Sequence, residues 1–211
     1  MKFFDAFSSE KKKGSLGEKE IGREFGIRSV LGKHGKIHKN LYVPAAGNKT
    51  SEIDLIFLCQ KGIFVIESKN VSGSIYGSEW QKNWTVLLSG GHKHSLYNPI
   101  RQNLTHLENL RKYLSDMEIP KEAFYNLVIF SDKTNLNNVT WTDSQTKVLQ
   151  VKDISSFLNE IWKEKRDMFS KEQVNNLSDI LLPLTKVSGK RKAEHVKWVN
   201  QVKTAEDPER E

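Results

Sequence analysis

The spacing of apolar residues divides the chain into segments with helical and strand-like periodicity. Over residues 15–31 apolar side chains recur three or four positions apart, which predicts a helix with one buried stripe. Ser15, followed three residues later by Glu18, fits a capping box at the start of this helix. Residues 37–43 then predict a strand, and the chain turns at the Pro and Gly that follow it.

Two nearly continuous apolar runs, residues 52–59 and 62–67, predict a β-hairpin. Because both runs are apolar on both faces, we expect central strands covered on both sides. A two-residue connection at positions 60 and 61 makes the numbers of opposed residues sum to 121, which places Asp54 opposite Glu67. A bulge at the glycine that opens the second run would shift this register by one residue.

The remaining pattern predicts further strands and helices. Residues 71–88, with two glycines and two tryptophans, predict short strands that cross the same sheet, and residues 90–94 predict a loop. Asn98 and Pro99 begin a second helix. Its predicted buried stripe is Ile100, Leu104, Leu107, Leu110 and Leu114. Further strands are expected at 125–131 and 148–151, and further helices at 154–162 and 171–182. This order predicts an α/β fold with a mixed sheet.

Composition adds the class of protein and the kind of partner. Apolar residues make up 37% and charged residues 28%, and no apolar run reaches membrane-spanning length, so a soluble protein without a membrane partner is expected. The single cysteine, Cys59, excludes an intrachain disulfide and fits a reducing cytoplasm. A net charge of +7 favours a polyanionic partner. The expected organisation is an arm at 1–14, one domain at 15–185, and a charged, partly disordered tail at 186–211.

The candidate chemistry lies on the predicted hairpin. Period-two alternation puts Glu67 and Lys69 on one face, and the register brings Asp54 to the same end. Two carboxylates aimed at one point repel each other unless a cation lies between them, and hard oxygen ligands suit Mg²⁺ or Mn²⁺. A lysine beside them can orient water and contact phosphate. The spacing fits an ordinary salt bridge at a strand end equally well.

The ordered series of motifs resembles the nuclease-related domain (NERD) family, a branch of the PD-(D/E)XK nuclease superfamily. The resemblance covers about residues 15–115. It is carried by Gly17-Glu18, by Glu52 to Ile56, by Gly62 to Asn70, by Gly73 to Ile75, by Trp84 and by Asn98 to Gln102. The family's proline before the aspartate is absent, because Ile53 stands there.

The resemblance implies a restriction-endonuclease-like fold: a mixed central β-sheet flanked by helices, here with a C-terminal helical extension. It also implies phosphodiester hydrolysis with Mg²⁺ or Mn²⁺, on DNA more than RNA. By position, Asp54 and Glu67 would bind the metal and Lys69 would be the catalytic lysine. Glu18 matches an accessory metal-binding carboxylate, although it could equally serve the capping box. Gln102 matches a glutamine that assists catalysis.

Several side chains outside this set are candidates for contacts with a ligand. Arg101, Lys93 and Asn70 could contact nucleic acid, as surface side chains near the phosphate. Trp80 and Trp84 either pack in the core or stack on bases. His92 and His94 could contribute to a zinc site. His34 and His38 are expected on the surface, where either could act as a general acid.

The chain as a whole fits two functions besides metal-dependent cleavage. One is a non-catalytic nucleic-acid-binding module, which would bind in a salt-sensitive manner without cutting. The second is a nuclease subunit of a larger defence or repair complex, which would act only with its partner. A homodimer or a partner protein is compatible with each of these functions.

Overall fold

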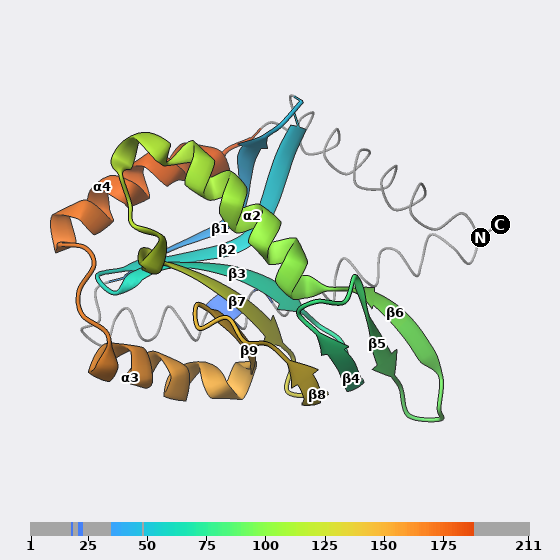
Figure 1. The fold of residues 1–211 in the computed structure, drawn as a ribbon. Helices are drawn as coiled ribbons and strands as arrows, with labels where there is room; N and C mark the ends of the chain where they lie inside the picture. Colours follow the sequence, from blue (N-terminus) through green and yellow to red (C-terminus); the bar gives the residue numbers. More distant parts are fainter. Residues whose placement is uncertain (1–17, 19–20, 23–34, 48, 188–211) are drawn as a thin grey trace.

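The computed structural model describes residues 18, 21, 22, 35–47 and 49–187 (Figure 1). Most of the predicted first helix, the arm at 1–14 and nearly all of the tail therefore lie outside the described residues. The three described residues of that helix, Glu18, Ile21 and Gly22, are helical. The strands are β1 (Gly35–Ala45), β2 (Lys49–Cys59), β3 (Gly62–Lys69), β4 (Gly73–Ser78), β5 (Asn83–Leu87), β6 (Lys93–Tyr97), β7 (Phe124–Phe130), β8 (Thr134–Thr140) and β9 (Thr146–Gln150); the helices are α2 (Pro99–Tyr113), α3 (Ile154–Glu164) and α4 (Lys171–Leu181).

The central sheet of the described chain has five strands in the order β1-β2-β3-β7-β9. β1, β2 and β3 are antiparallel, and β7 and β9 continue parallel to β3, so the sheet is mixed as predicted. In the β2–β3 hairpin, Leu55 pairs with Ile66 and Cys59 with Gly62, which confirms the predicted register. Gly62 has a φ of 155°, and a Cβ there would lie 2.6 Å from the carbonyl oxygen of Ala123.

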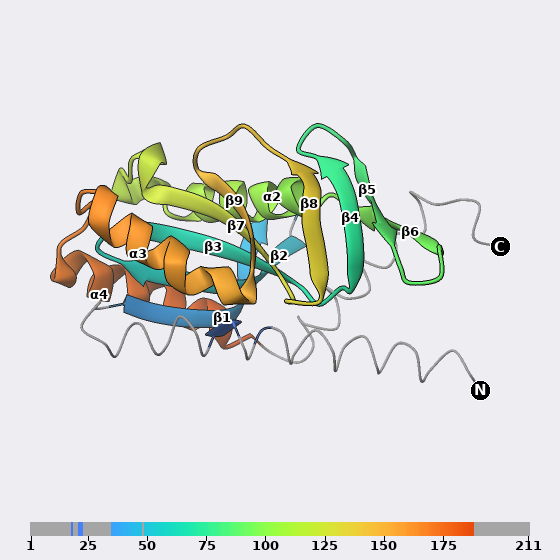
Figure 2. The same cartoon turned by 90° about the horizontal axis from the view of Figure 1, so that it is seen from below.

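Helices cover both faces of this sheet. α2 and α4 pack on one face, with Leu110 and Leu177 in a core shared with β1, β2 and β3. α3 packs on the other face, where Phe157 meets Phe64 edge to face. Figures 1 and 2 show α2 and α4 on the side of the sheet opposite α3. In the described part of the chain, no helix is both long enough and apolar enough to cross a membrane.

The sequence pattern predicted that residues 71–88 cross the central sheet, and this prediction is wrong. They build most of a second sheet, ordered β6-β5-β4-β8 within the described residues. Its core is Trp84, which packs against the backbone of Gly77 so closely that a Cβ there would lie 2.3 Å from the indole ring. β6 begins at Lys93, so part of the expected loop at 90–94 is strand. The sequence pattern also missed β8, because its seven residues include three asparagines and two threonines.

The two sheets meet where β3 leads into β4 and β7 leads into β8. β3 pairs with β7 and β4 pairs with β8, both in parallel. Partners differ by 61 in residue number on both sides of the junction, as in Lys69 with Phe130 and Gly73 with Thr134. Between them, the carbonyl oxygen of Val71 accepts hydrogen bonds from the hydroxyls of Ser131 and Thr134. The junction therefore fixes the end of β3 next to the second sheet.

Candidate active site

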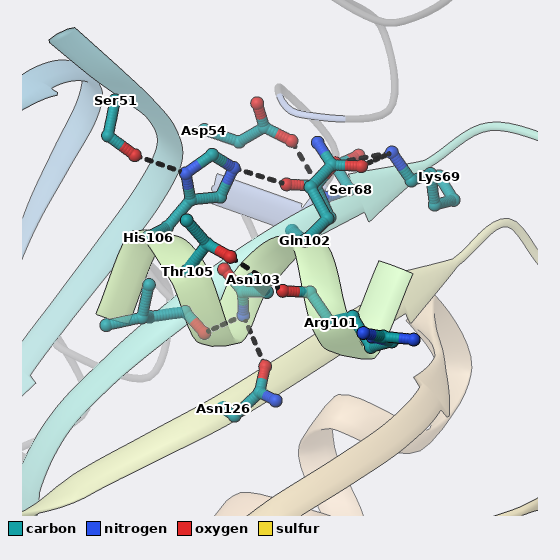
Figure 3. A network of polar contacts seen from close by, with 12 residues as sticks. Ser51, Asp54, Ser68, Lys69, Arg101, Gln102, Asn103, Thr105, His106 and Asn126 are labelled. Carbon is teal, nitrogen blue, oxygen red and sulfur yellow. Dashed lines mark hydrogen bonds and ion pairs between the residues drawn. The ribbon is translucent and has the colours of Figure 1, made fainter. Parts of the chain in front are cut away.

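The predicted acidic residues and lysine meet where β3 ends beneath α2 (Figure 3). Glu67 and Lys69 lie at the carboxyl end of β3, and Asp54 lies beside them on β2. α2 lies across these strands and supplies Gln102. Asn98 caps this helix, because its side-chain oxygen accepts hydrogen bonds from the backbone amides of the first turn.

Glu67 is the centre of the polar network and is only 3% exposed. Its Oε1 accepts hydrogen bonds from Nζ of Lys69 at 2.5 Å and from Nε2 of Gln102 at 2.8 Å. Its Oε2 lies 3.5 Å from Nε2 of His106. Burial alone would raise the pKa of Glu67, but Lys69 and then His106 outweigh it and lower the pKa to about 2. Glu67 is therefore a fixed, ionised carboxylate at neutral pH.

Lys69 lies between the carboxylate of Glu67 and the side-chain oxygen of Gln102, which it reaches at 3.1 Å. Burial alone would lower the pKa of Lys69, but Glu67 and then Asp54 raise it above its usual range. A raised pKa keeps the ammonium group protonated at neutral pH, so in the metal-free protein Lys69 carries a positive charge beside Glu67.

Asp54 faces Glu67 across the hairpin, and its Oδ2 accepts a hydrogen bond of 2.8 Å from the backbone amide of Ser68. Burial and then the negative charge of Glu67 raise the pKa of Asp54 well above its usual range. Two carboxyl groups with one lysine beside them leave a site that would gain from additional positive charge.

Glu18 is half-buried on the first helix, within electrostatic reach of this pair. Its pKa is raised by burial, then by Glu52, and also by Glu67. The structure therefore brings Glu18 close to the predicted site. Its second candidate role, a capping box with Ser15, falls outside the described residues.

His106 and Ser51 belong to this network and were missed by the sequence interpretation. Ser51 Oγ lies 2.6 Å from Nδ1 of His106, whose other nitrogen faces Glu67. When the serine hydroxyl donates to Nδ1, the proton of the ring is held on Nε2 and directed at Glu67. The spacing along the predicted helix could have indicated His106, because it lies four residues, about one helical turn, after Gln102 and so on the same face.

The residues predicted to contact nucleic acid are exposed. Arg101 precedes Gln102 on α2 and lies apart from the network in Figure 3. Asn70 follows Lys69 directly, and Lys93 begins β6 on the second sheet. The described structure gives these three no common cluster.

Two predictions about histidines differ from the structure. His38 is not a surface residue; it is 6% exposed, and its Nε2 lies 3.0 Å from the hydroxyl of Ser178 on α4. Among the described residues no three His, Cys, Asp or Glu side chains converge as a metal site, so no zinc cluster forms on His92 and His94 there. The same holds for Asp54, Glu67 and Glu18, so only the first two face each other as a carboxylate pair. Cys59 is buried, and burial raises its pKa to about 12.

The donor chemistry fits a hard divalent cation. Mg²⁺ commonly binds through one or two carboxylates and completes its shell with water and substrate phosphate. Asp54 and Glu67 offer two such carboxylates from adjacent strands. The unfavourable charge that raises the pKa of Asp54 is one that a bound cation would relieve. The residues therefore suit Mg²⁺ or Mn²⁺.

Comparison with known proteins places the chain in a family. Residues 13–131 match the nuclease-related domain family (NERD). An uncharacterized protein of Bacillus anthracis is 30% identical over 142 residues, which cover 67% of this chain and 64% of the relative, slightly less than two thirds of its length. No solved structure matches the chain. Because the family match spans more than half of the sequence, the chain belongs to the nuclease-related domain family.

Proposed function

We propose that this protein is a nuclease that hydrolyses phosphodiester bonds with Mg²⁺ or Mn²⁺, in DNA rather than RNA. The observation that carries the proposal is the pair of facing carboxyl groups, Asp54 and Glu67, with Lys69 hydrogen-bonded to Glu67 and within electrostatic reach of Asp54. A salt bridge at a strand end would need one carboxylate for one lysine. The second carboxyl group, buried at an electrostatic cost, is what a cation site requires and a salt bridge does not.

The fold fits the same proposal. We interpret the five-stranded sheet, with α2 and α4 on one face and α3 on the other, as a restriction-endonuclease-like core. In this interpretation β2 and β3 carry the reaction centre. α3 and α4 are the C-terminal helices that complete this core, and the second sheet stands beside it. The resemblance of this chain to the PD-(D/E)XK superfamily is a motif-level likeness.

In the proposed mechanism Asp54 and Glu67 would hold the metal, with Glu18 as an additional carboxylate. The bound metal would supply a more acidic water and polarise the phosphoryl group. Lys69 provides a fixed positive charge for the scissile phosphate, where negative charge develops during the reaction. Gln102 already contacts both Lys69 and Glu67, so it holds their side chains in register. His106 directs the second oxygen of Glu67.

The proposal is tested by incubating the purified chain with plasmid, linear duplex, single-stranded DNA and RNA, each with Mg²⁺, Mn²⁺ or EDTA. Cleavage should require the metal and fall at least a hundredfold in Asp54→Asn and Lys69→Ala. The control is Lys133→Ala, which changes an exposed lysine in the β7–β8 connection. Activity that persists in both site variants would refute the assignment. Salt-sensitive binding without any cleavage would instead favour a nucleic-acid-binding module or a subunit that needs a partner.

A further inference from the structure

The turn between β4 and β5 presents an unusually exposed tryptophan. Trp80 is 77% exposed, the highest value among the large hydrophobic side chains that the structure describes. Trp84, four residues later, is 1% exposed and forms the core of the second sheet. The sequence left open whether these tryptophans pack in the core or stack on bases. Trp84 packs in the core, whereas Trp80 is exposed and free of the core.

The backbone beneath Trp80 is firmly held. The side-chain amide of Asn98 donates hydrogen bonds to the carbonyl oxygens of Ser78, Glu79 and Gln81, at 3.1, 3.1 and 2.7 Å. The indole nitrogen of Trp84 donates to the oxygen of Ser78 at 2.9 Å. The donors, Asn98 and Trp84, are fully buried. An exposed aromatic ring on a fixed backbone loses little conformational freedom when a ligand stacks on it.

The residue that holds this turn also begins the helix of the candidate active site. Asn98 caps α2 with its side-chain oxygen, and its backbone oxygen accepts from the amide of Gln102 at 3.0 Å. The side chain of Gln102 reaches Glu67. A continuous set of hydrogen bonds therefore links the turn of Trp80 to the reaction centre, with the start of α2 between them (Figure 1).

The adjoining sheet offers further aromatic rings and no negative charge. Tyr97 and Tyr76 are 41% and 43% exposed, and each alternates along its strand with a residue that faces the core. The four strands of this sheet contain no Asp or Glu, whereas β6 contributes Lys93. In the turn itself the carboxylate of Glu79 is bonded to the amide and hydroxyl of Thr142. Exposed aromatic rings on strands without carboxylates are complementary to nucleic acid, whose bases stack and whose phosphates are anionic.

We propose that Trp80, with Tyr97 and Tyr76 on the adjacent strands, forms a stacking platform for unpaired bases, so that a single-stranded segment approaches the reaction centre past the start of α2. The proposal rests on the proposed function, in which nucleic acid is the substrate. It adds that the bound nucleic acid is single-stranded, which the residues of the reaction centre do not indicate. Bases in a duplex already stack on their neighbours, so a protruding indole gains most from bases that are unpaired.

The test measures binding without cleavage, so that it is independent of activity. A labelled oligothymidylate and a blunt duplex of equal length are titrated with protein in EDTA, and fluorescence anisotropy is recorded. Trp80→Ala should weaken binding to the single strand about tenfold and change duplex binding less than twofold, whereas Trp80→Phe should keep most of the affinity. The matched control is Tyr113→Ala, because Tyr113 is an exposed aromatic residue near the other end of α2. Circular dichroism confirms that each variant is folded.

A spectroscopic readout separates stacking from other contacts. Oligothymidylate should quench the intrinsic tryptophan fluorescence, and most of this quenching should disappear in Trp80→Phe. The proposal is overturned if Trp80→Ala leaves single-strand affinity unchanged, if it weakens both ligands equally, or if it mainly changes the molecular mass in light scattering. The last result would identify a contact between copies of the chain. Binding can follow the proposal even where no cleavage is seen, so its failure is distinct from failure of the nuclease assignment.

Discussion

At the scale of single residues, one buried oxygen connects most of the candidate site. Oε1 of Glu67 accepts from both Lys69 and Gln102, while Oε2 faces His106. Lys69 and Gln102 donate hydrogen bonds and Nε2 of His106 lies 3.5 Å away, so the carboxylate is ionised and held in one orientation. Small changes in any partner should therefore alter the position of a metal-binding oxygen before they alter the fold.

His106→Ala should lower cleavage about 10- to 100-fold, because removing a residue that orients a metal ligand typically lowers metal affinity or activity by that factor. Single-turnover cleavage and the midpoint of Mn²⁺-dependent thermal stabilisation would measure activity and metal affinity separately. Ser51→Ala should act in the same direction with a smaller effect. Thr105→Ala is the matched control, since Thr105 is exposed and bonds only within its own helix, to Arg101. Equal activity of His106→Ala and wild type would exclude the positioning role.

Asp54→Asn should make the metal-free protein more stable at neutral pH, by a few degrees in Tm. The folded pKa of Asp54 is raised by burial and Glu67, so the penalty on folding grows as the pH rises above the unfolded pKa and is complete above the folded pKa. The penalty vanishes below the unfolded value of about 4, where Asp54 is protonated in both states. The Tm difference should therefore shrink as the pH falls. Calorimetry in EDTA from pH 4 to 8 measures it, and a less stable variant at pH 7 would contradict the assigned electrostatics.

At the scale of elements, the sequence pattern predicted the strands that are apolar and failed for those that are polar. The hairpin register that joins Asp54 to Glu67 followed from continuous apolar runs and a two-residue connection. The second sheet was misplaced because its strands alternate small, polar and aromatic residues, which do not reveal their partner. Register within a hairpin is local information, whereas the pairing of β4 with β8 joins positions about 60 residues apart.

α2 illustrates the same limit within one helix. Its start was predicted, because Asn98 and Pro99 mark it by local chemistry. The stripe was partly wrong: Leu104 is 37% exposed, and the neighbouring Asn103 is fully buried. Asn103 donates to the carbonyl oxygens of Val65 and Leu127 and to the side chain of Asn126. Hydrophobic periodicity cannot identify a position where the core is polar, and His106 was overlooked on this helix for the same reason.

Asn103→Ala should lower the free energy of unfolding by about 2–3 kcal/mol, because it leaves buried acceptors on β3 and β7 without their donor. Urea denaturation followed by circular dichroism would measure the change. Leu104→Ala, one residue further along α2, is the matched control and should stay within about 1 kcal/mol of wild type. If the control were the more damaging substitution, the described orientation of α2 would be wrong.

At the scale of the whole molecule, the net charge of +7 leads to a prediction about salt. Binding to duplex DNA should weaken as salt rises, because each neutralised phosphate releases condensed counterions. Arg101→Ala and Lys93→Ala should each reduce the slope of log affinity against log salt by about 1 if that residue contacts a phosphate. Asn70→Ala should leave the slope unchanged, since it removes no charge. A slope that none of the three alters would place the phosphate contacts elsewhere on the surface.

The junction between the two sheets has a consequence for how this family can change its length. The segments that connect β3 to β4 and β7 to β8 preserve the same offset of 61 between partners, so the two connections are equally long. The β4–β8 ladder already contains one register shift, between Ser74 and Tyr76. A one-residue insertion in the β3–β4 connection alone would shift β4 further against β8 and turn its alternating side chains over, directing Tyr76 inward. Related sequences should therefore gain or lose residues in both connections together, and an alignment of relatives would reveal this as paired insertions and deletions.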